Sequence, residues 1–411
     1  MPSLRETLRG HTAAGHKLYL ILPRFDLFSD DLNEVVVRQD LVDEVEVAPC
    51  RWLRPLKKFR ALSKRFSGKK VLPYPARWIL NMAMLLLLTV SLFRAARRVT
   101  GRGIQPDLVY AHNQYAALAG FLVARFLGVP NVTRLYGTFL ADLIQKPFVS
   151  LRYPTAAAGY RVPSNLLICA NDGTRGDEVA RAFKVSDSRF RFWQNGVDPP
   201  LSPPNLTRRE IAERFNGALR LGSQWLVSCS RLSYWKRIDR MLHAVAVCKN
   251  CGGDCQLLIA GDGPERESLQ PLAHRLGIAD EAVFLGALAH DDIWALMNVA
   301  DIFMITNDVT NRCNPLYEAA WAGLPVVSVV DSSTADLLQD GKNALLAEKD
   351  DVQAMGAKLL ELCRNQALRN RMRKAQKELA ASFWTWEERM RVETRELEAL
   401  VANWKFDCAR S

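Results

Sequence analysis

The sequence predicts an α/β protein built from two doubly wound, Rossmann-like domains. Three observations support this fold class. Short apolar runs alternate with segments of helical periodicity, the alternation restarts after about residue 222, and a proline-rich linker at residues 199–204 separates the two halves. Alternating strands and helices favour parallel sheets joined by right-handed crossovers. A chain of 411 residues is long enough for two or three such domains.

The first half shows five elements in order. We expect a helix over residues 4–14, a strand over residues 17–22, a second strand over residues 107–110, a helix over residues 116–127 and a strand over residues 131–135. The strand segments are short apolar runs, whereas the helical segments repeat their apolar residues every three or four positions.

The second half repeats the alternation. A helix is expected to begin near residue 238, because the apolar residues that follow recur at the spacing of one helix face. Strands are predicted at residues 225–229, 256–260, 283–285, 302–305 and 325–330.

The composition is that of a globular cytoplasmic protein. Hydrophobic residues make up 49% of the chain and charged residues 24%, which excludes disordered and fibrous classes. The nine cysteines are scattered and no segment resembles a secretion signal, so we expect a reducing compartment. The spacing of Cys248, Cys251 and Cys255 is compatible with a metal, but the segment offers no fourth ligand. A Gly-Gly turn accounts for its polar part, so we predict no metal site.

The positive charge is concentrated in one segment. Residues 51–106 contain 14 Lys and Arg and no Asp or Glu, whereas the net charge of the whole chain is +11. The rest of the chain is therefore slightly acidic. A nucleic-acid-binding protein would spread its positive charge more widely, so we predict no nucleic-acid partner and a local patch that faces anionic lipid or a phosphate-rich acceptor.

Two parts of this segment favour a membrane surface. Residues 51–70 interleave nine cations with apolar residues at helical spacing, which is typical of a basic amphipathic helix. Residues 79–93 are mostly apolar but too few to span a bilayer, so we expect a buried or interfacial helix. The alternative is an ordinary basic surface beside a core helix.

Candidate binding residues are sought beyond the carboxyl ends of the strands, where open α/β sheets bind their ligands. Arg231 and Lys236 flank the loop that follows residues 225–229. Both can converge on one diphosphate, with Arg as a fork and Lys as a point charge. Two cations in a loop are also typical of a solvated surface.

A second motif follows residues 302–305. Asn314 is expected to be the N-cap of a helix and Pro315 its first residue, so that free N–H groups face the crevice and suit a phosphate. Glu318, one turn further on, has its Cβ tilted toward the same end and can accept hydrogen bonds from ribose hydroxyls. The alternative is an ordinary capped helix with a surface glutamate.

A third motif, Gly261-Asp262-Gly263-Pro264, follows residues 256–260. Two glycines after a strand allow a tight turn and the close approach of a ligand, although such a turn alone is weak evidence.

Taken together, these motifs resemble the nucleotide-sugar domain of the GT-B glycosyltransferases, in particular the retaining family 4, also called glycosyl transferases group 1. The resembling segments are Arg231 with Lys236, residues 261–264, and Asn314-Pro-Leu-Tyr-Glu318 with its later Gly-Leu-Pro-Val. The first half is similar to the family at His112, which ends Asp-Leu-Val-Tyr-Ala-His, at Tyr136-Gly137, and at Asn195-Gly-Val-Asp. The resemblance covers about residues 10–395.

The resemblance implies two Rossmann-like domains that face each other across a cleft. They would span residues 1–200 on the acceptor side and residues 201–385 on the nucleotide-sugar side. A final helix over residues 386–411 would pack back toward the first domain. We also expect the strand that usually opens the first domain to be missing, which leaves the strands at residues 17–22 and 107–110 unpaired with each other.

The resemblance also implies roles for single residues. Arg231 and Lys236 would hold the donor diphosphate and stabilise the charge that develops on it, Glu318 would bind the ribose, and His112 would lie near the donor sugar. Tyr136 and Gly137 would lie on the acceptor side. Gly261, Asp262 and Gly263 would contact the donor, and no cofactor or metal would be required.

The chain departs from the family at one donor position. Members usually carry a glutamate eight residues before the second one, and here that position is Thr310. Asp308, Asn311 and Asn314 are the nearby polar residues. We expect donor-sugar contacts from Asn311, Asn314 and backbone amides of the Thr310 loop.

The leading hypothesis is an enzyme that moves a sugar from a nucleotide-sugar donor to a lipid-linked or glycan acceptor, with retention, at the inner face of the membrane. One alternative is a non-catalytic protein that binds sugar nucleotides, and another is a sugar-nucleotide epimerase of the same fold. Turnover with a donor and an acceptor excludes the first, and isomerisation of the donor alone indicates the second. Fold alone does not choose among them.

Overall fold

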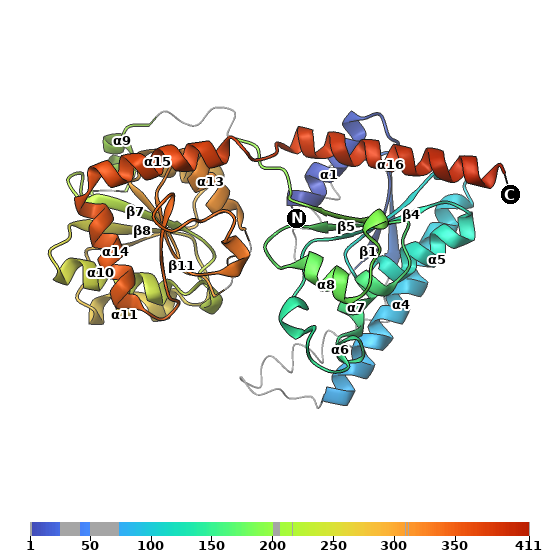
Figure 1. Cartoon of the computed structure of the whole chain (residues 1–411), viewed down its shortest axis with the longest axis horizontal. Helices are drawn as coiled ribbons and strands as arrows, with labels where there is room; N and C mark the ends of the chain where they lie inside the picture. Colours follow the sequence, from blue (N-terminus) through green and yellow to red (C-terminus); the bar gives the residue numbers. More distant parts are fainter. Residues whose placement is uncertain are drawn as a thin grey trace. The chain divides into compact units, whose positions relative to one another are not determined.

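The computed structural model describes residues 2–24, 42–49, 74–199, 206–215, 217–308, 310 and 312–410. The chain forms two compact units (Figure 1). Unit 1 contains Met1–Gly196 together with Trp384–Ser411, and unit 2 contains Val197–Phe383. The α/β class with parallel sheets that the sequence predicts is confirmed. Most of the proline-rich stretch at residues 199–204 lies outside the described residues.

Unit 2 is built on a six-stranded parallel sheet in the order β12-β11-β10-β7-β8-β9. Its strands are short apolar runs because both faces of the sheet are covered. Their bounds are β7 Gln224–Cys229, β8 Cys255–Ala260, β9 Ala282–Gly286, β10 Ile302–Ile305, β11 Val326–Val329 and β12 Ala344–Ala347.

Two helix layers cover the two faces of this sheet, each with its own apolar cluster (Figure 1). One layer consists of α10 Ile238–Asn250, α11 Arg266–Arg275 and α14 Val352–Arg364. The other consists of α9 Arg208–Arg214, α12 His290–Val299 and α13 Asn314–Ala322. The helix α15 Gln366–Ala380 contributes buried residues to both clusters.

The order of strands reverses beside β7. From β7 the chain continues to β8 and β9 on one side, and then crosses to β10, β11 and β12 on the other. A ligand crevice is expected outside the carboxyl ends of the strands at such a reversal. The loops after β7, β8 and β10 therefore surround the position where unit 2 is expected to bind its ligand.

Unit 1 contains two separate parallel sheets. Four strands pair in the order β3-β4-β5-β6, and β1 pairs with β2 alone. The bounds are β1 Tyr19–Arg24, β2 Glu44–Pro49, β3 Val109–His112, β4 Asn131–Leu135, β5 Leu166–Ala170 and β6 Phe190–Trp193. In the described part of the chain β1 does not pair with β3.

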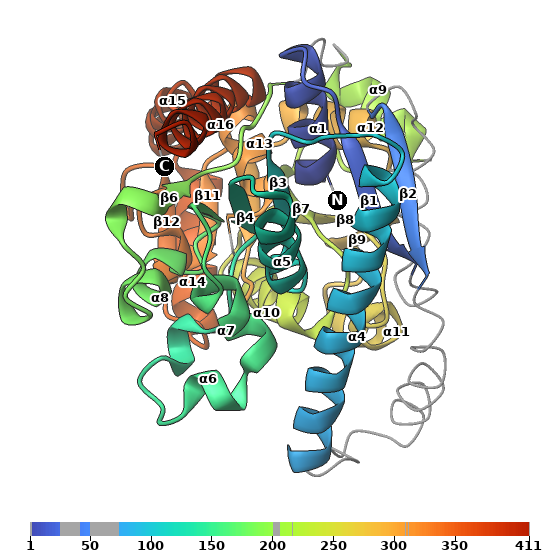
Figure 2. The same ribbon diagram turned by 90° about the vertical axis from the view of Figure 1, so that its right-hand side faces the viewer.

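Helices cover both sheets of unit 1 (Figure 2). The long helix α4 contacts β1, β2 and α5, and α5 in turn contacts β3 and β4. The helix bounds are α1 Pro2–Ala13, α4 Tyr74–Thr100, α5 Ala117–Leu127, α6 Val149–Arg152, α7 Pro154–Arg161 and α8 Gly176–Ala182. Within the residues that the structure describes, no helix is both long enough and apolar enough to cross a membrane.

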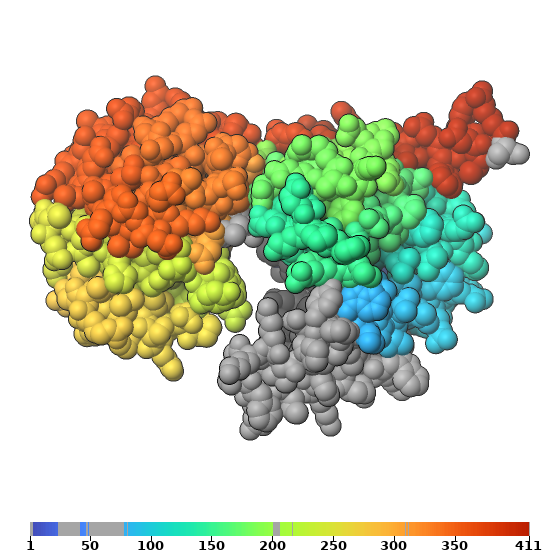
Figure 3. Space-filling view, turned by 60° about the horizontal axis from the view of Figure 1, so that its bottom comes forward, coloured from blue at the N-terminus to red at the C-terminus, as the bar shows by residue number. Residues whose placement is uncertain are grey.

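The last helix, α16 Trp386–Cys408, belongs to unit 1. It begins at a capping box in which Thr385 and Glu388 satisfy each other's backbone N–H groups. Its buried face packs against α1, and Leu397 joins the apolar cluster over β4 and β5. Its last turns are exposed and extend beyond the rest of unit 1 (Figure 3).

Candidate functional site

Two cations that follow β7 have no carboxylate partner among the residues that the structure describes. Arg231 is exposed, and its guanidinium makes no hydrogen bond or ion pair with the described residues. Lys236 lies at the end of the 3-10 turn Tyr234–Lys236. The side-chain amide of Asn307, which follows β10, lies against Lys236. Assigned in the orientation that satisfies both of its ends, it accepts from Lys236 Nζ at 3.2 Å and donates to Lys236 O at 3.3 Å. The neutral Asn307 amide therefore orients the Lys236 ammonium group, whose positive charge is not paired with a carboxylate of the described residues.

The start of α13 lies beside Lys236. Burial raises the pKa of the Cys313 thiol, and the nearby positive charge of Lys236 opposes that effect. The N-cap is Cys313, and no side chain caps the helix. Our expectation that Asn314 is the N-cap is wrong by one residue, because Asn314 already has helical geometry and its side chain is exposed. The free N–H groups and the positive end of the helix dipole suit an anion.

Glu318 is a nearly buried carboxylate one turn inside α13. The residue is only 8% exposed, and burial raises the pKa of its carboxyl group. His290, at the start of α12, opposes that shift from 3.9 Å, measured from Nδ1 to Oε1. In the described part of unit 2, Glu318 accepts no hydrogen bond. A buried carboxylate without a donor is poised to accept hydrogen bonds from a ligand.

The glycines after β8 serve the neighbouring loop. A Cβ on Gly261 would lie 1.9 Å from Ser230 O, and one on Gly263 would lie 2.3 Å from Leu232 O. Leu232 N also donates to Asp262 O at 2.9 Å. The sequence suggested close approach to a ligand, whereas the structure shows close approach to the backbone that carries Arg231. The turn thus fixes the position of that loop.

The position of the family's first glutamate is buried. Thr310 is 1% exposed, its N–H donates to Asp331 Oδ2 at 2.7 Å, and its hydroxyl has no partner among the described residues. Asn311 lies outside the described residues. Asp308 accepts from Arg240 Nη1 at 2.8 Å, so this end of the loop is anchored to α10.

Unit 1 holds the remaining predicted residues at the ends of β3 and β4. His112 Nδ1 lies 2.7 Å from Tyr136 Oη. Loss of hydration and the charge of Arg134 lower the pKa of His112 to about 3, so its ring is neutral at pH 7. Gly137 follows Tyr136 in a left-handed conformation, φ 110°, where a Cβ would collide with Asp172.

A buried cluster of charged side chains lies next to His112 and Tyr136. Glu393 of α16 is fully buried and accepts from Arg134 Nη1 at 3.0 Å, from Arg389 Nη2 at 2.7 Å and from the Tyr110 hydroxyl at 2.7 Å. Arg134 and Arg389 outweigh the cost of burying this carboxylate and hold its pKa well below the usual range. His11 of α1 lies 3.4 Å from the same group. The cluster joins α1, β3, β4 and α16.

Sequence reasoning missed several of these residues. Asn307 and His290 carry no motif, although each lies next to a predicted strand end or helix start. Glu393 is far along the chain from its partner Arg134, so no local spacing reveals the pair. Arg240 was the easiest of these residues to recognise in the sequence, because it lies only four residues after the predicted cation loop that ends at Lys236. The described residues therefore form two groups, one in unit 2 with two free cations and a buried carboxylate, and one in unit 1 with a neutral histidine.

Two family models match this chain. Glycosyltransferase Family 4 matches residues 3–200, and Glycosyl transferases group 1 matches residues 210–379. Together they cover most of both units.

Curated relatives and solved structures agree with these matches. A GDP-mannose-dependent α-(1-6)-phosphatidylinositol monomannoside mannosyltransferase of Mycobacterium tuberculosis is 29% identical over 55% of this chain and 62% of its own length. An α-monoglucosyldiacylglycerol synthase of Streptococcus pneumoniae is 25% identical over 57% of this chain and 54% of its own. The matched part is thus less than two thirds of either relative. The Anabaena protein HepE, solved with UDP and glucose, covers 96% of both chains at 18% identity and a TM-score of 0.65.

Proposed function

The chain belongs to the GT-B glycosyltransferases, and on that premise we propose that it transfers a sugar from a nucleotide-sugar donor to a lipid-linked or glycan acceptor at a membrane surface, with retention. The observation that carries the proposal is the arrangement in unit 2. Arg231 and Lys236 lack carboxylate partners, the start of α13 is uncapped, and Glu318 is buried one turn further on. A nucleoside diphosphate has the complementary groups, namely two phosphates and two ribose hydroxyls.

In this proposal the chemistry is mainly electrostatic. Negative charge grows on the diphosphate as the bond to the sugar breaks, and fixed cations stabilise that charge without having to reorganise. Arg231 and Lys236 fill this role, which a divalent cation fills in many enzymes that act on phosphate groups. The N–H groups of α13 add to it. Glu318 accepts from the ribose, which fixes the donor relative to the cations.

The lipid acceptor is proposed from the relatives and from one surface. One relative is named a phosphatidylinositol monomannoside mannosyltransferase and another an α-monoglucosyldiacylglycerol synthase. On unit 1, α4 and α5 form a continuous surface (Figure 3). Residues of both helices line a groove of about 630 Å³. Apolar side chains are exposed there, among them Leu86 at 54% and Phe126 at 55%. Three arginines, Arg94, Arg97 and Arg125, line the same groove.

This combination suits the headgroup region of an anionic bilayer. Exposed apolar side chains enter the interface, and flanking arginines pair with lipid phosphates. Arg97 lies over the Phe126 ring at 5.6 Å, which keeps cation and aromatic ring together. We therefore propose a peripheral position at the inner face of the membrane. The basic segment at residues 51–70 lies outside the described residues, whereas the predicted helix at residues 79–93 is part of α4.

Vesicle binding tests this surface. We expect the protein to sediment with anionic vesicles and much less with neutral ones. Added salt should weaken this binding, because at about 0.1 M it screens the attraction between charges that are more than about 10 Å apart. Neutralising Arg94, Arg97 and Arg125 to Gln should cost about 1 kcal/mol each, or roughly 100-fold together. The matched control replaces three exposed cations of unit 2, Arg209, Arg371 and Lys374. Equal binding to neutral and anionic vesicles would contradict the proposal.

Turnover tests the function itself. We expect release of nucleoside diphosphate when the protein is given a UDP- or GDP-sugar together with vesicles that contain phosphatidylinositol or diacylglycerol. NMR of the product should show the anomeric configuration of the donor. A soluble glycan in place of the lipid separates the two acceptor classes. Binding without turnover across this panel would indicate a non-catalytic protein, and isomerisation without acceptor would indicate an epimerase.

A further inference from the structure

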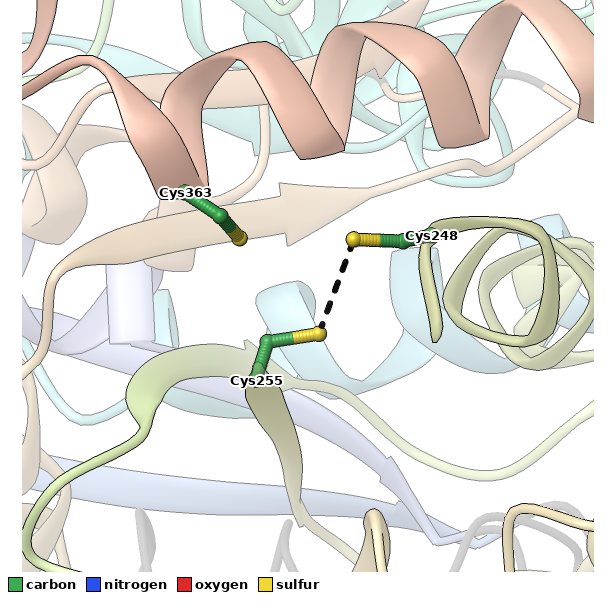
Figure 4. Close-up of side chains that lie close together, drawn as sticks. All are labelled: Cys248, Cys255 and Cys363. Carbon is green, nitrogen blue, oxygen red and sulfur yellow. Dashed lines mark hydrogen bonds between the residues drawn. The ribbon is translucent and has the colours of Figure 1, made fainter. Parts of the chain in front are cut away.

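Three cysteine side chains meet at the edge of unit 2 where β8 begins. Cys248 lies near the end of α10, Cys255 is the first residue of β8, and Cys363 lies near the end of α14 (Figure 4). Their Sγ atoms all lie within 4.8 Å of one another, and those of Cys248 and Cys255 are 3.9 Å apart. In the described part of the chain this is the one group of three or more potential metal ligands.

We propose that Cys248, Cys255 and Cys363 form a three-thiolate site for a soft d¹⁰ cation, Zn²⁺ or Cu⁺. Thiolates are the preferred ligands of both ions. With metal–sulfur bonds of about 2.3 Å, tetrahedral or trigonal geometry places sulfur atoms roughly 3.8–4.0 Å apart. The observed 3.9 Å between Cys248 and Cys255 already has this value. The 4.8 Å limit on the other pairs requires less than 1 Å of closure.

The sequence alone did not suggest this site. The segment that contains Cys248 and Cys255 offered no further ligand. Cys363 is more than 100 residues away in the chain and lies beside them because α14 packs against α10. The turn between them is built for close approach. A Cβ on Gly253 would lie 2.4 Å from Cys248 Sγ, so a glycine is needed where the chain passes under the end of α10.

The surroundings suit a negatively charged metal–thiolate group. Arg364 is held beside the group by the carbonyl of Cys251, at 2.7 Å, and Arg369 by the carbonyl of Cys363, at 2.9 Å. Three thiolates on Zn²⁺ leave one negative charge, and on Cu⁺ two, which these guanidinium groups offset. Binding would release one proton for each thiol that ionises.

The position in the fold indicates a structural or metal-sensing role. Cys255 begins β8, whereas the Gly261 turn of the proposed donor site follows its other end. Six residues of extended strand separate these ends by roughly 17 Å. Cys248 and Cys255 are buried, while Cys363 is partly exposed and gives an ion a way in. We therefore expect metal to raise stability without changing nucleotide affinity, so this inference and the proposed function fail separately.

Titration of the reduced full chain with Zn²⁺, with Cu⁺ and with Co²⁺ as a spectroscopic probe tests the site. We expect one ion per chain, thiolate-to-cobalt charge-transfer absorption, and a higher melting temperature that a chelator reverses. Tighter binding of Cu⁺ or of Zn²⁺ identifies the ion. Cys363→Ala should weaken binding at least tenfold, and so should Cys248→Ser and Cys255→Ser. Cys408→Ser, at an exposed position in α16, is the control.

Cys363→Ala carries the test if the buried variants do not fold, because this side chain is the least buried of the three. Nucleotide affinity should be the same in this variant as in the unchanged protein. The proposal is overturned if the unchanged chain and Cys363→Ala bind Zn²⁺ and Cu⁺ equally. It is also overturned if the purified protein contains a Cys248–Cys255 disulfide, recognised as a mass about 2 Da below the reduced chain that reductant restores and metal does not affect.

Discussion

Replacing Glu393 with alanine is expected to destabilise the protein by about 3–5 kcal/mol, the cost of breaking a buried ion pair from one side. The change leaves Arg134 and Arg389 almost fully buried without their shared carboxylate. It also removes the acceptor of the Tyr110 hydroxyl. Denaturant unfolding, followed by a probe in unit 1, measures the loss. The cluster is less important than we infer if the free energy of unfolding falls by less than about 1 kcal/mol.

A matched control comes from the same helix. Glu387 pairs with Arg391 one turn later, but both side chains are mostly exposed, so Glu387→Ala should cost less than about 0.5 kcal/mol. Glu393→Gln keeps the volume and one acceptor oxygen, and should fall between the two. This ordering separates the effect of the charge from that of the helix.

Acidification should reproduce part of the Glu393 effect. The pKa of Glu393 is lower in the folded protein than in the unfolded chain, so its stabilisation is complete above the unfolded value near 4.5 and is lost as the pH falls below it. His112 acts in the same direction. Its pKa is lowered to about 3, so between pH 6.5 and pH 3 protons favour the unfolded chain. Glu393→Ala should flatten the pH dependence below pH 4.5.

Removing either free cation should weaken donor binding without unfolding the chain. Charge-assisted bonds to phosphate contribute roughly 1.5–3 kcal/mol, so Arg231→Ala and Lys236→Ala should each lower the affinity for a nucleoside diphosphate about 10- to 150-fold. Neither side chain has a carboxylate partner whose loss would cost stability. Calorimetric titration of each variant gives the affinities.

The phosphates themselves provide the sharpest control for these variants. The affinity for the corresponding nucleoside, which has no phosphate, should be the same in Arg231→Ala, Lys236→Ala and the unchanged protein. Lys374→Ala, on the exposed face of α15, should leave both affinities unchanged. Unaltered diphosphate binding in both site variants would remove Arg231 and Lys236 from the donor site.

The parts of the fold that the sequence predicts well are those with a local cause. The strand Ile302–Ile305 is buried on both faces, so it appears as an unbroken apolar run and its predicted bounds match the structure. The predicted bounds of Asn131–Leu135 also match, although this buried strand contains Asn131, Thr133 and Arg134. The strand Glu44–Pro49 was not recognised, because its Glu-Val-Glu-Val pattern is half charged. Its glutamates form ion pairs with Arg98 of α4 and with Arg102, which follows α4. These contacts join residues more than 50 positions apart, so no local pattern reveals them.

The candidate site divides in the same way. Lys236, Asn314 and Glu318 could be proposed as site residues because helix starts and strand ends have sequence signals. The contact of Asn307 with Lys236, and in unit 1 the pairing of Glu393 with Arg134, could not be predicted, because each joins residues far apart in the chain. Spacing also does not reveal burial, so the sequence did not show that the side chain of Thr310 is enclosed.

Because α16 belongs to unit 1, it determines the order in which the two units can finish folding during synthesis. All of unit 2, Val197–Phe383, is synthesised between Arg134 and its partner Glu393. At about 5–20 residues per second, nearly 200 residues take roughly 10–40 s. During that time β4 carries an arginine meant for burial, with no carboxylate to receive it. Unit 2 can therefore mature first, and unit 1 stays open to chaperones and proteases until the last helix leaves the exit tunnel.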